Sequence, residues 1–476
     1  MPLLSVTSSE DSRTGKLPAA LRECGRSSCA FAWLAAHRSL LGALALAVVF
    51  SVCTVRLLHL IDKLAVNVIF GDEWDFLGGL FEDRGWWDLF TWRHGPHREG
   101  LGYAVIKICA AVSSWDTRFE AFVVGGITVA SAVVAVLLKR SLHRTWSLFD
   151  VCIPLIVLTV AQSEQFVCVI NPAHGSVPLL LLLLLTLTTM IELARLRVAL
   201  MVTLNFLAIY TGFGVLLGPI TVVLFAIQLY GAVEDRRETV AHAVGLLSAL
   251  AGFGSFFLWH YRFAPTLDCF TFPDAHPINY VRFLAMLYVR LFEAQDLVQW
   301  RFFLGSLLLC IHLVVFAWAV YGTLASRGRS RAHVAIFILS GFSLTFGVNA
   351  AIGRVCLGPG AALASRYVPY GVPIMLALYL ALCCSPLPPR VRLAFLTVFT
   401  VLCVVKEVHI KQDMVVFKAC AHVKQHWRDC YLEIGSIDAC DARTNARLYP
   451  NPPATNMQGK LDFLQAHQLN LFKPGG

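Results

Sequence analysis

Long apolar runs recur along the whole chain and restrict it to one kind of fold. A helix that crosses a bilayer needs about 20 mostly apolar residues. Charged residues make up only 14% of the sequence, against roughly a quarter in ordinary soluble domains. The runs predict an all-α fold, a polytopic transmembrane helix bundle of about eleven spans. The spans are expected at residues 40–60, 119–138, 147–161, 176–193, 198–213, 215–231, 240–258, 300–323, 332–350, 367–384 and 391–408.

Lysine and arginine gather in alternate loops, which indicates the orientation of the bundle. Short cytoplasmic loops carry an excess of these two residues. If the N-terminus is cytoplasmic, the basic clusters all fall inside, at residues 139–144, 195–197, 236–237, 327–331 and 390–392. The outer side then holds residues 61–118, 162–175, 259–299, 351–366 and the tail from 409. The net charge of +9 is explained by inner loops that meet anionic lipid, and it is no evidence for nucleic acid.

Composition changes along the chain predict three parts. Residues 1–39 are rich in Ser, Arg and Gly and are expected to be a cytoplasmic, disordered segment. The apolar run from Leu40 has the full spanning length and no clear cleavage site, so it reads as a retained signal anchor. Residues 40–408 form the bundle with its outer loop 61–118, and residues 409–476 form a small extracytoplasmic segment.

The cysteines differ in meaning with their location. Most lie inside apolar runs, where a cysteine behaves as a small hydrophobe. Cys420, Cys430 and Cys440 lie in the outer tail, where an oxidising compartment permits disulfides. Three cysteines have no unique pairing, and Cys269 or Cys356 could join from other outer loops. The chain has no Cys-x-x-Cys spacing, so a structural zinc site made of cysteines is not expected.

Three carboxylates stand within four residues just beyond the first span. Asp72, Glu73 and Asp75 cannot all stay ionised without cost in a low-dielectric pocket. Either one of them gains a raised pKa, or the three share a divalent cation such as Mg²⁺ or Mn²⁺. The first outcome suits a general base and the second a metal site. The alternative is a set of solvated acids in a surface loop.

Two histidines and an arginine follow in the same outer loop. His94, His97 and Arg98 suit phosphate binding, because arginine offers a two-pronged donor and histidine a switchable one. An equally weighted alternative is a turn at Gly95–Pro96 with solvated side chains around it. A histidine metal site is a third option that ranks below these, since no His-Glu-x-x-His motif is present.

More polar groups are placed on the outer side by the same topology. Each of them alone reads as a helix cap or a headgroup contact. Arg366 directly precedes an apolar helix, so it could reach headgroup phosphate without a catalytic role, or it could hold a lipid pyrophosphate. Together with the acid cluster they predict one outer site. The further candidates for substrate binding are Asn171, His174, Arg354, Arg366 and Tyr367.

The segment Gly71–Asp75, with His97 and Arg98 downstream and Ser365–Tyr367 late in the chain, is similar to poorly characterised bacterial members of the GT-C superfamily of integral-membrane glycosyltransferases. The resemblance implies a polyprenyl-phosphate-linked sugar donor and inverting transfer to a glycan, lipid or protein acceptor. It also implies a multi-pass protein of the bacterial inner membrane. An acidic base in the first outer loop is transferred to Asp72, with Glu73 as its neighbour.

Two other classes remain open. A transporter or flippase of lipid-linked or small anionic substrates would also use arginines and acids. Such a protein places charged or broken-helix elements near the bilayer midplane, in related halves. A membrane acyltransferase or phosphotransferase would act at the interface as well, but it needs a nucleophile or a His-Asp pair that the chain does not display clearly. A non-catalytic scaffold is the plainest alternative.

Overall fold

The computed structural model describes residues 26–232, 235–258, 261–263, 267–294, 296–408, 410–450 and 455–474. Side chains are described from residue 37 onward, apart from residues 411 and 412. Residues 1–25, most of the segment that was expected to be disordered, lie outside the described residues.

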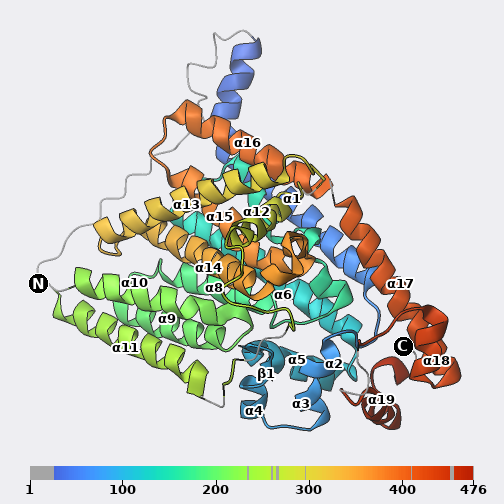
Figure 1. Cartoon of the computed structure of the whole chain (residues 1–476). Helices are drawn as coiled ribbons and strands as arrows, with labels where there is room; N and C mark the ends of the chain where they lie inside the picture. The colour runs from blue at the N-terminus through green and yellow to red at the C-terminus, as the bar shows by residue number, and fades with distance from the viewer. Residues whose placement is uncertain are drawn as a thin grey trace, which may run out of the picture.

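Long apolar helices dominate the fold (Figure 1). Within the described residues, eight helical stretches are long and apolar enough to cross a membrane, and each overlaps a predicted span. The last of them, Pro389–Ile434, extends well beyond the predicted end at residue 408. A helix satisfies its backbone hydrogen bonds internally, as an apolar bilayer requires. The all-helical class and multi-pass membrane character are therefore as expected. The stretches contain α1 (Arg26–Leu64), α6 (Thr117–Leu142), α10 (Leu217–Gly231), α11 (Arg236–Leu258), α13 (Arg301–Ala325), α14 (Arg331–Arg354), α15 (Val368–Cys384) and α16 (Pro389–Val408).

The other three predicted spans form shorter helices. Residues 147–161 fold into η2 (Leu148–Val151), α7 (Cys152–Val157) and η3 (Val160–Gln162). The runs 176–193 and 198–213 give α8 (Ser176–Thr188) and α9 (Ala194–Ile209), of 13 and 16 residues. A 16-residue helix is about 24 Å long, less than the roughly 30 Å of a hydrocarbon core. The count of eleven spans therefore stays a prediction.

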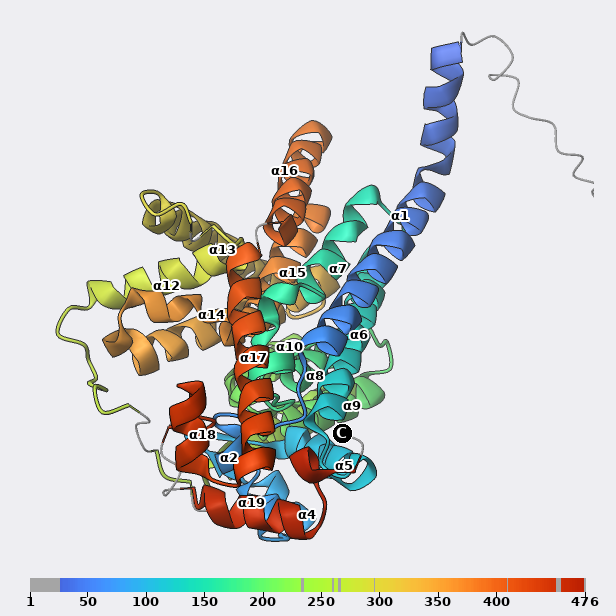
Figure 2. The same ribbon diagram turned by 90° about the vertical axis from the view of Figure 1, so that its right-hand side faces the viewer.

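Two helices form the centre of the bundle. In the most apolar stretch of α14, 72% of the residues are buried, and in that of α15, 83% are buried. In α1, α11 and α13 only 22% of the corresponding residues are buried. The latter three therefore lie at the periphery with apolar side chains facing outward. The first half of α1 extends past the other helices (Figure 2).

A buried ion pair fixes the bundle at one end. Lys139 of α6 and Asp150 of η2 are joined by an Nζ–Oδ2 distance of 2.7 Å, with side chains 3% and 0% exposed. The Lys139 ammonium also donates to the Thr145 carbonyl at 2.6 Å, and the Tyr379 hydroxyl of α15 donates to Asp150. The pair thus holds three segments together.

Short elements gather at one end of the bundle in both views (Figures 1 and 2). Those of the first predicted outer loop are α2 (Glu73–Phe76), α3 (Gly78–Phe81), α4 (Trp86–Phe90), β1 (Arg93–His94), β2 (His97–Arg98) and α5 (Gly100–Ser113). The chain continues elsewhere through η4 (Glu164–Cys168), η5 (Phe213–Leu216), α12 (Ile278–Leu291), η6 (Val355–Leu357), η7 (Pro359–Leu363) and η8 (Ser365–Tyr367). The tail adds α17 (Lys411–Ile434), α18 (Ile437–Thr444), α19 (Met457–Ala466) and η9 (Asn470–Phe472).

The tail and the first loop share one apolar core. Trp74 and Phe76 of α2 belong to the same buried cluster as Trp427 and Leu461 of the tail. Polar contacts accompany this packing at the ends of both segments. The amide of Asn67 donates to the Asn470 carbonyl at 2.9 Å, and the amide of Asn470 donates back to the Asn67 side chain at 2.8 Å. The tail is therefore built onto the loop.

Two disulfides settle the pairing that the sequence left open. Cys430 bonds to Cys440 within the tail, and Cys269 bonds to Cys356 between two other predicted outer loops. Cys420 is a free thiol.

We expect Asp150→Ala to destabilise the fold strongly, because it leaves the Lys139 ammonium buried without its counter-charge. Breaking a buried pair costs about 3–5 kcal/mol in the free energy of unfolding. The matched control is Glu192→Ala, which removes a pair with Arg331 (Nη2–Oε1 distance 3.4 Å) whose Glu192 side chain is 89% exposed. That change should cost at most about 1 kcal/mol. Denaturant unfolding of the purified proteins measures both, and equal losses would contradict the prediction.

Candidate functional site

The acid cluster begins at a tight turn. Gly71 has φ +59°, a left-handed conformation that glycine adopts without strain, and its N–H donates to the Leu448 carbonyl at 2.7 Å. Asp72 is the N-cap of α2, yet its side chain makes no capping hydrogen bond. The turn therefore presents Asp72 at the surface and directs Glu73 inward.

Glu73 is a buried anchor. Its two oxygens accept hydrogen bonds from the backbone N–H groups of Ile170 and of Phe70, the latter at 2.8 Å. Burial raises the pKa of this carboxyl to about 7, against the opposing effects of the Lys424 ammonium and the two N–H donors. Since the side chain is only 1% exposed, Glu73 links the start of α2 to the loop before α8.

The other two acids have different surroundings. Asp75 accepts a hydrogen bond from the Tyr449 hydroxyl at 2.5 Å. The Asp72 carboxylate is exposed and has no hydrogen bond or ion pair with any residue that the structure describes. The ligand atoms of the three acids are not among those that converge within 4.8 Å in the described part of the chain, so a cation shared by them stays a prediction from the sequence.

Arg366 lies beside the acid cluster. Its guanidinium pairs with Glu164 at an Nη1–Oε1 distance of 3.6 Å, and its backbone N–H donates to the same carboxylate at 3.0 Å. The chain runs from Glu164 to Ile170, whose N–H bonds to Glu73, so Arg366 and the acid cluster lie at the same end of the bundle. The Arg366 side chain is 51% exposed, so it can still meet an anion. We call Asp72, Glu164 and Arg366 the acid–arginine group.

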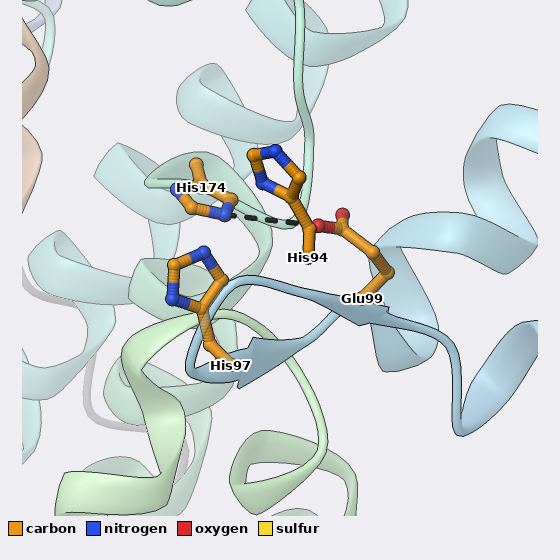
Figure 3. A group of neighbouring side chains, drawn as sticks. All are labelled: His94, His97, Glu99 and His174. Atoms are coloured by element: carbon orange, nitrogen blue, oxygen red, sulfur yellow. Dashed lines mark ion pairs between the residues drawn. The ribbon is translucent and has the colours of Figure 1, made fainter. Parts of the chain in front are cut away.

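The β1–β2 hairpin sorts its side chains by alternation. His94 pairs directly with His97 and Arg93 with Arg98, so the two histidines share one face and the two arginines the other. Glu99 follows two residues after His97 and lies on the histidine face (Figure 3). Gly95, at φ +59°, permits the tight turn between the strands.

His174 joins this face from a different segment. Asn171 shapes the segment, because its side-chain oxygen accepts the Ala173 N–H at 2.8 Å and its carbonyl accepts the His174 N–H at 3.0 Å. The His174 ring lies 4.3 Å from the His97 ring, centroid to centroid, and its Nε2 lies 3.7 Å from a Glu99 oxygen (Figure 3). We call His94, His97, Glu99 and His174 the histidine–glutamate group.

Burial sets the protonation state of His97. The ring is buried, and burial lowers the pKa of His97 well below its ordinary value, assisted by the charges of His174, His94 and Arg354. His97 is therefore a neutral imidazole at physiological pH, with an unshared electron pair on one nitrogen.

The remaining predicted residues fall into separate roles. Arg98 is buried, and its guanidinium donates to the carbonyls of Thr91 at 2.7 Å and of Phe256 in α11 at 2.8 Å, so it joins the first loop to the end of α11. Arg354 ends α14, and its charge acts on His97. Tyr367 is buried beneath Arg366, with its ring 5.8 Å from the guanidinium.

The structure thus divides the predicted site into two groups. Phe76 of α2 packs edge-on against His94 at 5.8 Å between ring centroids, which connects the acid cluster to the hairpin.

Sequence reasoning missed Glu99 and Glu164. The spacing His94-x-x-His97-x-Glu99 around a Gly-Pro turn carried the signal for Glu99, whereas the pairing of Glu164 depends on a contact across more than two hundred residues.

Comparison of the chain with protein-family models, with curated proteins and with solved structures found no match. The candidate site is therefore interpreted from its own geometry.

The buried Glu73 carboxyl should make stability depend on pH. Its pKa is about 7 in the fold and 4.5 in an exposed carboxyl, so the folded state binds the proton more tightly than the unfolded chain does. The contribution of Glu73 to the free energy of unfolding is fully present below pH 4.5 and is lost as the pH rises through about 7. The loss is on the order of 3 kcal/mol.

Melting temperatures at pH 5 and pH 8 measure this effect. The parent should lose more stability than Glu73→Gln between these two pH values. Glu82→Gln, which changes an exposed carboxyl of the same loop, should behave as the parent does. An unchanged pH dependence in Glu73→Gln would exclude this residue as its source.

Proposed function

We propose that the chain is a GT-C-like membrane glycosyltransferase, which transfers a sugar from a polyprenyl-phosphate-linked donor to an extracytoplasmic acceptor with inversion. The observation that carries the proposal is the acid–arginine group. Asp72 is an exposed carboxylate without a hydrogen-bond partner among the described residues. The half-exposed Arg366 pairs with Glu164 of η4, and the chain runs from there to Ile170, whose N–H bonds to Glu73 beside Asp72. A base and a cation at one bundle end are what sugar transfer from a lipid phosphate requires.

Asp72 is the base in this mechanism. Its carboxylate takes the proton from an acceptor hydroxyl, whose oxygen forms a bond to the anomeric carbon of the sugar. The bond from that carbon to the phosphate oxygen breaks at the same time, and the polyprenyl phosphate leaves with the electron pair. Glu73 and Asp75 have partners inside the protein, so they hold the turn and leave Asp72 free to react.

Arg366 stabilises the departing phosphate. Arginine binds phosphate oxygens in a two-pronged geometry, and its pairing with Glu164 at 3.6 Å leaves the guanidinium partly exposed. Its place at the start of the α15 span is the headgroup depth, where a lipid-borne phosphate lies. A divalent cation is not needed for this division of roles.

The proposed orientation places the N-terminus in the cytoplasm of a bacterium and the acid–arginine group outside its inner membrane. Both disulfides lie in segments assigned to the outer side, and disulfides persist in oxidising compartments. The eleven-span count needs α8, α9 and residues 148–162 to cross as well. Contacts between loops at the two ends suit this alternation: Arg98–Gly212 and Glu164–Arg366 on the outer side, and Glu192–Arg331 and Gly231–Arg329 on the inner side.

Asp72→Asn tests the base. Full-length protein in lipid nanodiscs is supplied with a panel of polyprenyl-phosphate sugars and soluble or lipid acceptors, and transfer is followed by mass spectrometry. Loss of a general base should lower kcat by about 100-fold or more. The matched control is Asp88→Asn, which neutralises an exposed aspartate of the same loop and should leave transfer unchanged.

Three outcomes would count against the proposal. Parent-like transfer by Asp72→Asn would remove Asp72 as the base. An equal loss of sugar transfer in Asp88→Asn would show that removing any negative charge from the loop lowers activity. Uptake or flipping of donors by the parent without transfer of the sugar would favour the transporter class.

Arg366→Ala tests the phosphate contact. We expect the KM for the donor to rise roughly tenfold or more, because a charge-assisted hydrogen bond contributes about 1.5–3 kcal/mol. The matched control is Arg443→Ala, which removes an exposed guanidinium that pairs with Glu433 in the tail and should leave the KM unchanged. An unchanged KM in Arg366→Ala would show that the donor phosphate binds elsewhere.

A further inference from the structure

Four metal-ligand side chains converge where the β1–β2 hairpin meets the loop before α8. His94, His97, Glu99 and His174 each offer one ligand atom, and these atoms all lie within 4.8 Å of one another. In the described part of the chain, no other group of three or more histidine, cysteine or acidic side chains converges in this way. The rings and the carboxylate point toward a common centre (Figure 3).

The polar atoms of this group lack hydrogen-bond partners among the described residues. Both oxygens of Glu99, both ring nitrogens of His97, Nε2 of His174 and Nδ1 of His94 are buried without a donor or acceptor. The approach of His174 to Glu99 at 3.7 Å is too long for a hydrogen bond. A fully buried carboxylate without such a partner is costly, and a bound cation removes that cost.

We propose that His94, His97, Glu99 and His174 bind one divalent transition-metal ion of the zinc type. Imidazole nitrogens suit zinc and its first-row neighbours, and one carboxylate oxygen completes a tetrahedral set. In such a site the ligands lie about 2 Å from the ion and so about 3.4 Å from one another. The side chains reach this geometry by closing in by roughly an ångström. The negative charge of Glu99 offsets part of the ion's charge.

Close backbone contacts join the segments that carry the four side chains. The Gly212 N–H donates to the Arg98 carbonyl at 2.7 Å. A Cβ atom on Gly212 would lie 2.0 Å from the Ala173 carbonyl oxygen, so only glycine allows this approach. Close packing thus brings both ligand-bearing segments together, and Phe213 lines the histidines with its ring centroid 4.8 Å from that of His97.

The role we infer for this ion is structural. All four positions of a tetrahedral ion are taken by protein, as in metal sites that stabilise folds. The ion would join the first loop to the segment that carries Asn171 and Ile170, the partner of Glu73. The inference does not depend on the proposed glycosyl transfer.

Metal content tests the proposal directly. Full-length protein without a histidine tag is purified in detergent with Zn²⁺, freed of loose ions by gel filtration, and measured by inductively coupled plasma mass spectrometry. We expect about one ion per chain in the parent, and less than a tenth of that in Glu99→Gln and in His94→Gln. Two variants are used because His94 is half-buried and its change disturbs packing less than that of Glu99.

A second histidine pair provides the control. His422 and His426 of α17 lie on one helix face with ring centroids 3.9 Å apart, so they could hold an adventitious ion. The double change His422→Ala and His426→Ala should leave the metal content at one. Loss of the ion in this control, with retention in Glu99→Gln, would overturn the proposal.

Thermal stability gives a second test of metal binding. Stripping with a chelator should lower its melting temperature, and added Zn²⁺ should restore it, because an ion that binds only the folded state stabilises it. Glu99→Gln should show neither change. A parent that stays metal-free after incubation with Zn²⁺, Co²⁺ and Mn²⁺, with an unchanged melting temperature, would also overturn the proposal. Sugar transfer is not part of these readouts.

Discussion

The fold follows from the need to satisfy backbone polar groups in an apolar surrounding. Helices meet this need along the bundle, so irregular backbone is confined to the ends. There the loops must use one another as hydrogen-bond partners, and segments far apart in sequence are forced together. The bonds from Phe70 and Ile170 to Glu73 and the bridge between Arg98 and Gly212 are examples.

Two distinct arrangements result from this crowding. In one, an exposed acid and an exposed arginine face the surroundings. In the other, three imidazoles and a carboxylate face one another, with His97 and Glu99 buried and His94 and His174 half-buried. The first suits chemistry on a substrate, and the second suits a bound ion that holds the loops in place. Glu73 belongs to neither arrangement but supports both, because it fixes the start of α2 and bonds the segment that leads to His174.

Much of this could be predicted from apolar periodicity alone. All eight stretches of spanning length were expected, because a run of about twenty apolar residues has the length and composition of a membrane-spanning helix. The run that forms α8 was expected to be longer, and the run that forms α9 was expected four residues further along the chain, because hydropathy does not reveal where a helix begins or ends. Asp72 and its neighbours were visible as a cluster, but the burial of Glu73 and the carbonyl contacts of Arg98 depend on distant backbone. Glu99 was missed because alternation matters only once a hairpin is known to form.

The shared core of the first loop and the tail also sets an order for biosynthesis. Asp75, Trp74 and Asn67 find their partners 374, 386 and 403 residues later, at Tyr449, Lys460 and Asn470. A ribosome delivers those partners only after at least 374 further residues have been made. The loop that carries Asp72 must therefore wait, partly unpacked, while every helix between is inserted. Residues made after all the helices in between complete the core around the first loop, so a chain that stops before Tyr449 leaves that core open.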